Sequence, residues 1–329
     1  MKVKMLSSLL VVVMLLLPVG LKAQKQVTDF LEMGVEDARI VSEAYLRPYG
    51  EMLGKSLNGG WYNSAAVHRI GGFDLTFGVN MAMVPDVGKT FDVTALLPQM
   101  SAGWSLEDPN LNMAPTVAGS LPEGLRPRLQ YEGNYVLTLP DGSGFDKLPA
   151  PMVQAAVGLP WHTEVAVRFI PSTSLGDAGK VNLYGFGVKH SLKEYIPFLK
   201  RMPMLQSSLM LGYTRMGAEV DVRAYGGGGS DQQLEISSGA FTSRLLVGLN
   251  MPILALYTGV GYGTTNSDFA LKGDYGPGLG QDPFTLGYAT NGVDFNAGLR
   301  LRFGFFAIHG DYTFGDYSML SAGVGINIR

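Results

Sequence analysis

Long stretches of the chain alternate large apolar residues with polar or small ones, and this period of two constrains the fold more than any other feature. Residues 73–83 read FDLTFGVNMAM and residues 293–303 read VDFNAGLRLRF. Residues 161–169 and 320–329 follow the same rule. Because successive side chains of a β-strand point to opposite faces, each stretch places one kind of residue on each face. The pattern predicts β-strands with one apolar face.

Strand length and the type of polar residue distinguish a membrane barrel from an exported soluble β-sandwich. Many of the alternating stretches reach about ten residues, against about 5–6 for most soluble strands. Their polar positions hold mainly Gly, Ser, Asn and Thr, and only 16% of the chain is charged. Such a face suits the lumen of a barrel better than a surface rich in Lys and Glu. We therefore predict an all-β fold, an antiparallel transmembrane β-barrel.

Aromatic residues support this prediction, because they gather near the predicted strand ends, where membrane–water interfaces would lie. They are Trp61, Tyr62, Trp161, Tyr184, Phe186, Tyr257, Tyr262, Tyr288, Tyr312 and Tyr317.

We expect about twelve strands, with ten to fourteen compatible with the pattern. They lie near residues 65–84, 91–97, 128–139, 151–158, 161–170, 181–190, 205–222, 234–249, 253–269, 286–303, 305–313 and 317–329. Longer polar loops at 171–181, 224–233 and 271–284 alternate with short turns, as in outer-membrane barrels. Residues 98–127 are too rich in proline for one strand, so they would cross the rim or enter the lumen. Residues 192–202 predict a short amphipathic helical turn.

Residues 1–23 predict a signal peptide. Lys2 and Lys4 form a positive start, residues 9–17 an apolar core, and cleavage would follow Ala23. The core is too short for a membrane helix, which needs about 20 apolar residues. We therefore expect export to the bacterial outer membrane, with residues 61–329 as the barrel and membrane lipid as its surroundings.

Residues 24–60 predict a helical segment ahead of the barrel. Apolar residues recur at helical spacing between residues 27 and 57. Thr28 would cap the start, and a first helix would end near Arg47 and Pro48, since proline disfavours helical geometry in the residue before it. One or two helices would then lie inside the lumen as a plug, or below it.

Composition and motifs offer no chemistry of a catalytic kind. Cysteine is absent and the net charge is −3, which argues against thiolate metal sites and nucleic-acid binding. His68, His162, His190 and His309 show no metal-ligand spacing. His309 and Asp311 share a face, but no nucleophile motif accompanies them. We predict no cofactor, no metal site and no enzymatic activity.

The candidate functional residues are charged side chains on the inward face of the strands. Charged rings in a pore set solute preference, but the same charges can also pair and fill a narrow barrel. The candidates are Glu164, Arg168, Arg244, Asp294, Arg300, Arg302, His309 and Asp311.

Three segments resemble an uncharacterised family of exported barrel proteins. They are HRIGGFDLTFGVNMAMVP (68–85), LPWHTEVAVRFIP (159–171) and GFGVKHSLKEYIP (185–197), and the NGGW of residues 58–61 belongs to the same resemblance. In architecture, this family is similar to the long-chain fatty-acid transporter barrels, which carry an N-terminal plug. The resemblance implies passive transport of small solutes, hydrophobic ones included. The alternative is a structural or cell-surface interaction barrel without transport.

Overall fold

The computed structural model describes residues 30–174, 179–221, 230–276 and 280–328. The predicted signal peptide, the Thr28 cap and parts of the three predicted long loops lie outside these residues. In the described part of the chain, no helix is both long and apolar enough to cross a membrane.

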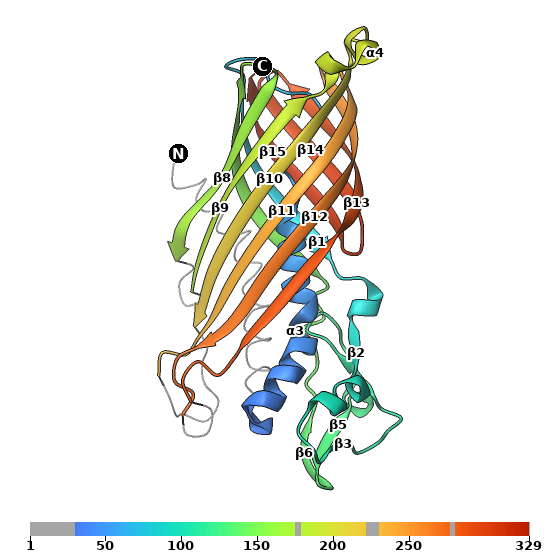
Figure 1. Cartoon of the computed structure of the whole chain (residues 1–329), viewed down its shortest axis with the longest axis vertical. Coiled ribbons are helices and arrows are strands. Elements are labelled where there is room, and N and C mark those ends of the chain that lie inside the picture. Colours follow the sequence, from blue (N-terminus) through green and yellow to red (C-terminus); the bar gives the residue numbers. More distant parts are fainter. Residues whose placement is uncertain (1–29, 175–178, 222–229, 277–279, 329) are drawn as a thin grey trace.

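Within the described residues, ten antiparallel strands form a closed barrel (Figure 1). Each strand pairs with its neighbour, and β1 closes the ring by pairing with both β15 and β7. The strands are β1 (Phe73–Met83), β7 (Lys147–Leu159), β8 (Thr163–Ser174), β9 (Lys180–Ser191), β10 (Leu205–Asp221), β11 (Gln233–Asn250), β12 (Leu254–Lys272), β13 (Thr285–Phe303), β14 (Phe306–Phe314) and β15 (Ser318–Ile328).

The central expectation of twelve strands is wrong, because two of the predicted segments pair outside the barrel. Residues 91–97 and 128–139 fall in an insertion between β1 and β7, residues 84–146, which we call the mouth domain. Its strands are too short to span a membrane and pair locally instead. They are β2 (Thr90–Asp92), β3 (Trp104–Leu106), β4 (Met113–Pro115), β5 (Arg128–Tyr131) and β6 (Asn134–Thr138), with 3-10 turns η2 (Asp86–Gly88), η3 (Val93–Ala95), η4 (Leu97–Gln99) and η5 (Glu123–Leu125).

The outer face of the barrel is apolar. Alternate residues of the strands point outward, and large apolar side chains such as Val167, Tyr213, Phe241 and Phe295 are exposed there. A closed ladder satisfies the backbone hydrogen bonds without water, so a barrel with such a belt is suited to a bilayer.

The segment before the barrel is a short 3-10 turn, η1 (Leu31–Met33), followed by one helix, α3 (Val35–Asn58). The expected end near Pro48 is wrong, because the helix continues through this proline. A proline in a helix interior removes one hydrogen bond and displaces a carbonyl. The carbonyl affected here is that of Ala44; next to it, the Tyr45 carbonyl accepts from the Val117 N–H at 2.9 Å, which holds this turn of the helix against the mouth domain. Burial of Tyr45 and Tyr49 on this stretch further stabilises the helix.

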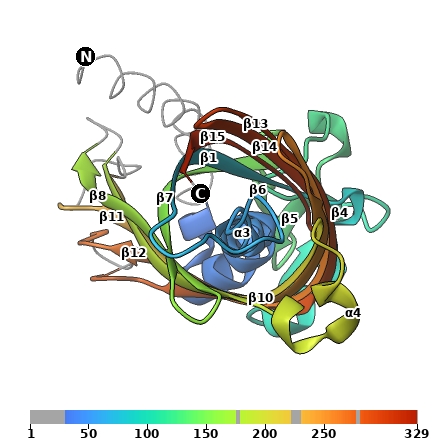
Figure 2. The same ribbon diagram turned by 90° about the horizontal axis from the view of Figure 1, so that it is seen from above.

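Helix α3 runs into the barrel from the mouth domain (Figures 1 and 2). Two glycines allow it to lie against the wall, because a Cβ at Gly50 would clash with the Tyr288 ring and one at Gly54 would lie 2.5 Å from the Thr265 Cβ. The Tyr317 hydroxyl donates to the Glu51 carboxylate at 2.7 Å. Burial and this carboxylate raise the pKa of Tyr317, so the phenol keeps its proton.

The first half of α3 belongs to an apolar core at one mouth of the barrel. Phe30, Val41 and Tyr45 pack with Val93, Val117, Leu129 and Leu139 of the mouth domain. Phe269, Leu271, Phe284 and Leu286, at the ends of β12 and β13, complete the same core. This mouth also carries the longer loops, so we call it the long-loop mouth.

The chain leaves the lumen at the opposite mouth, where residues 160–162, 251–253 and 304–305 form tight turns and, among the described connections, only 192–204 is longer. Gly71 N–H donates to the Gly158 carbonyl at 3.0 Å, which places residue 71 beside the end of β7. The predicted helical turn is found at the same mouth as η7 (Lys193–Tyr195) and α4 (Pro197–Lys200). The chain therefore passes through its own barrel before β1 begins.

We predict that Gly54→Leu disturbs the seating of α3. The added side chain would run into Thr265, and overpacking of this kind costs about 1–3 kcal/mol. Thermal unfolding of the detergent-solubilised protein should show a lower midpoint. Gly124→Leu is the control, because nothing lies within 4 Å of a Cβ at Gly124. Equal midpoints for the two variants would contradict this packing.

Candidate functional site

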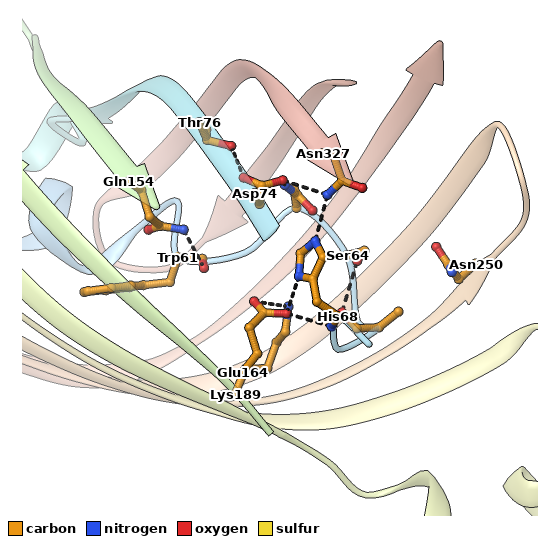
Figure 3. Close-up of polar contacts among 12 residues, drawn as sticks. Trp61, Ser64, His68, Asp74, Thr76, Gln154, Glu164, Lys189, Asn250 and Asn327 are labelled. Atoms are coloured by element: carbon orange, nitrogen blue, oxygen red, sulfur yellow. Dashed lines mark hydrogen bonds and ion pairs between the residues drawn. The ribbon is translucent and has the colours of Figure 1, made fainter. Parts of the chain in front are cut away.

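The lumen beyond the end of α3 contains a buried polar network (Figure 3). Its centre is His68, whose Nδ1 lies 2.6 Å from Glu164 Oε2. The second Glu164 oxygen accepts from Lys189 Nζ at 3.0 Å. Since Asn327 Nδ2 donates to His68 Nε2 at 2.9 Å, the Nδ1 of a neutral imidazole carries the proton toward Glu164. The segment that follows α3, residues 59–72, is thus held between β8, β9 and β15. Together with α3 it forms the plug of the lumen.

Asp74 of β1 extends this network. It accepts from Asn327 at 2.8 Å and from Asn63 at 2.9 Å, and the Thr76 hydroxyl donates to its other oxygen. Asp74 and its three partners are buried. A buried polar group is tolerated only with such hydrogen bonding. Asn63 of the plug and the wall residues Asp74 and Asn327 therefore stabilise one another.

A second cluster caps the C-terminal end of α3. Arg168 donates to the Leu57 carbonyl at 3.0 Å and to the Gly59 carbonyl. Asn80 donates to the Ser56 carbonyl at 2.9 Å. The last carbonyls of a helix have no partner within it and form the negative end of its dipole, which favours a cation there. The barrel wall therefore supplies the C-cap that the helix itself lacks.

Trp61 occupies a socket beside this cap. The Arg168 guanidinium lies 3.7 Å from the centre of its ring, a cation–π geometry. Gly187 and Gly212 make room, because a Cβ at either position would lie 2.8 or 2.6 Å from the indole. Gln154 Nε2 donates to the Trp61 carbonyl at 3.1 Å. The wall is thus shaped for this one side chain.

Most of the other predicted inward residues also have partners inside the lumen. Arg300 donates to Asn63 at 3.1 Å and to Asn250 at 3.0 Å. Arg244 lies 2.6 Å from Asp294, and Asp311 accepts from Tyr257 at 3.3 Å. These contacts join the plug to the wall or the strands to one another.

Two predicted residues stand apart. Arg302 lies near the end of β13 and donates to the Pro252 carbonyl at 3.1 Å, away from the network. His309 is buried over Gly323, and its Nδ1 has no hydrogen-bond partner among the described residues. Asp311, on the same face, accepts from Tyr257. No cluster in the described chain resembles a metal site.

Sequence reasoning missed the plug half of the site. Asn63 and Ser64 give no motif, and His68 falls in the expected strand 65–84, which in the structure begins only at Phe73. A usable signal was the density of small and polar residues between Asn58 and Arg69, directly before the first strand. A segment of that kind buries many polar groups, so it needs hydrogen-bonding partners such as those of this lumen.

Fold and lumen together define a closed β-barrel whose interior is occupied by its own N-terminal segment. The chain belongs to a family of unknown function, DUF6588, which matches residues 1–328. No curated protein matches the sequence.

Several solved outer-membrane barrels show distant similarity. The translocator domain of the autotransporter NalP from Neisseria meningitidis has a TM-score of 0.31 and 14% identity, over 80% of this chain and 90% of that one. Ail of Yersinia pestis has a TM-score of 0.22 and 8% identity, over 79% and 98%. The Pseudomonas putida toluene transporter TodX has a TM-score of 0.23 and 10% identity, over 78% of this chain and 67% of that one. These TM-scores are low, so the architecture rests on the strand pairing itself.

We predict that Arg168→Met loosens the plug. The variant removes the charged donor from the Leu57 and Gly59 carbonyls, which keep only Thr214 and Asn80, and a hydrogen bond of a charged group contributes about 1.5–3 kcal/mol. Denaturant unfolding in detergent should show a lower unfolding free energy, and protease should cut residues 59–68 sooner. Arg302→Met is the control, since this arginine makes one peripheral hydrogen bond. The capping role is wrong if both variants behave alike.

Proposed function

We propose that this protein is an outer-membrane β-barrel that is closed by its own plug and displays the mouth domain at the cell surface. The observation that carries this proposal is that the inward-facing charged side chains already have partners inside the lumen. Arg168, Arg300 and the Glu164–Lys189 pair bind the plug or its surroundings instead of facing an open channel. The barrel then serves as an anchor for interaction, without a standing pore.

The apolar belt and the loop lengths support the location and the orientation. Closed barrels with an apolar exterior are found in outer membranes, with short turns in the periplasm and longer loops outside. The mouth domain lies at the long-loop mouth, and Val87, Leu125 and Tyr135 expose apolar side chains on it. These residues form the surface offered to a partner.

A labelling experiment tests this orientation. The chain has no cysteine, so each variant carries a single thiol. We expect Val87→Cys in the mouth domain to react with a membrane-impermeant maleimide on intact cells. Phe305→Cys, in the turn between β13 and β14, should react only after the outer membrane is broken. The reverse pattern would exclude surface display of the mouth domain.

Passive transport of small, hydrophobic solutes is the second candidate, with the plug as a gate. The observation that favours it is the polar character of the contacts between plug and wall. Water can replace hydrogen bonds to main-chain carbonyls, such as those of Leu57 and Gly59. Asn58, Thr242 and Ser321 also carry buried polar atoms without a partner among the described residues. Apart from the apolar cluster that Trp61 and Tyr62 form with wall residues such as Met210, the plug contacts can therefore exchange with water.

Conductance in planar bilayers separates the two candidates. We expect the wild-type protein to show no steady conductance, because the plug fills the lumen. The double variant Glu164→Gln/Arg168→Met should open in discrete steps, since it removes a buried ion pair and the helix cap. Steady conductance of the wild type would contradict the closed-barrel proposal. A silent double variant would contradict gated transport.

A further inference from the structure

We infer that residues 192–204, which we call the interface segment, bind anionic phospholipid headgroups at the short-turn mouth. This inference rests on the proposed insertion of the barrel in a membrane. The segment connects β9 to β10 and contains η7 and α4. Figure 2 shows α4 outside the ring of strands, beside β10, where lipid rather than lumen would surround it.

The interface segment exposes more apolar surface than a loop in water would. Phe198 is 66% exposed and Tyr195 69%, and Ile196, Met202 and Met204 are exposed as well. A contiguous patch of this kind marks a contact with a membrane or a partner. Below it, the outward residues Leu209 and Leu211 of β10 continue the apolar belt. Because the patch is continuous with the apolar belt of the barrel, we take lipid as its binding partner.

Its charges suit a headgroup layer. Lys193, Lys200 and Arg201 outnumber the single acid, Glu194. Lys200 pairs with Glu194 at 3.3 Å, whereas Arg201 forms no ion pair within the described chain. Arginine binds phosphate well because its guanidinium presents several donors in one plane. Basic residues flanked by apolar ones are typical of segments that lie in an anionic interface.

The backbone of the interface segment is held in place for this contact. Lys193 Nζ donates to the carbonyls of Met202 and Pro203 at 2.9 and 3.0 Å, so this lysine closes the loop. The Tyr195 hydroxyl lies 3.0 Å from His190 Nε2 of β9. The first contact joins the two ends of the segment and the second ties it to β9, while Phe198 and Arg201 stay exposed. A fixed segment loses less conformational entropy when it binds lipid.

The partner is a glycerophospholipid with an anionic headgroup in the leaflet at the short-turn mouth. The depth of the segment is tested by tryptophan quenching in vesicles of phosphatidylcholine and phosphatidylglycerol with brominated acyl chains. Phe198→Trp should be quenched strongly above the background of the three native tryptophans. Val87→Trp in the mouth domain is the negative control, and Phe241→Trp in the apolar belt is the positive control.

The two controls distinguish this inference from the proposal on which it rests. Quenching of Phe241→Trp without quenching of Phe198→Trp would overturn the interface segment and leave the membrane barrel intact. If neither is quenched more than Val87→Trp, membrane insertion itself is wrong.

The headgroup preference is tested by native mass spectrometry with phosphatidylglycerol. Arg201→Gln should lower the apparent affinity for this lipid roughly five-fold, the effect of one basic residue at an anionic surface. Lys180→Gln, the same change of charge at the opposite mouth, is the control. Equal retention of phosphatidylglycerol by the two variants would overturn the assignment of Arg201.

Discussion

The structure depends on the cap that the barrel wall places on the end of α3. A helix that ends inside a closed lumen leaves carbonyls that water reaches poorly, and each one costs free energy if it stays unpaired. Arg168 and Asn80 supply the missing donors from the wall. In return, the Arg168 charge is stabilised by the helix dipole, the carbonyls and the Trp61 ring. The end of the helix and the buried arginine of the wall therefore stabilise each other.

This dependence explains why the inward charges do not line a channel. Barrels of eight strands are filled by side chains, and those of sixteen or more leave an aqueous path. The ring of ten strands in the described chain lies between these cases. It is wide enough to admit a backbone segment, and that segment then needs polar partners. Glu164, Arg168 and Arg300 provide them, so the role of these residues in the fold is to bind the plug.

The sequence predicted the barrel well because one face of each strand is apolar and the other is not. Alternation placed Arg168 and Arg300 on the inward face, and both are buried in the lumen. It failed for residues 91–97 and 128–139, whose short strands find partners inside the mouth domain, β2 with β4 and β5 with β6. Periodicity reports which face is apolar, but it does not report the partner strand. The Pro48 error has a similar origin, because tertiary contacts override a local helix-breaking preference.

The candidate site could be predicted only in half for the same reason. Strand parity gives the wall residues, whereas residues 58–68 follow no period that would place them opposite the wall. The two halves of the plug also differ in chemistry. Its outer half packs Phe30 and Val41 into a large apolar core with the mouth domain. Its inner half combines hydrogen bonds with a smaller apolar cluster around Trp61. Separating an apolar core exposes surface to water at a cost, whereas water can replace the polar contacts. Opening of the lumen would therefore begin near Asn63 and His68, where polar contacts hold the plug, with the mouth domain still bound to α3.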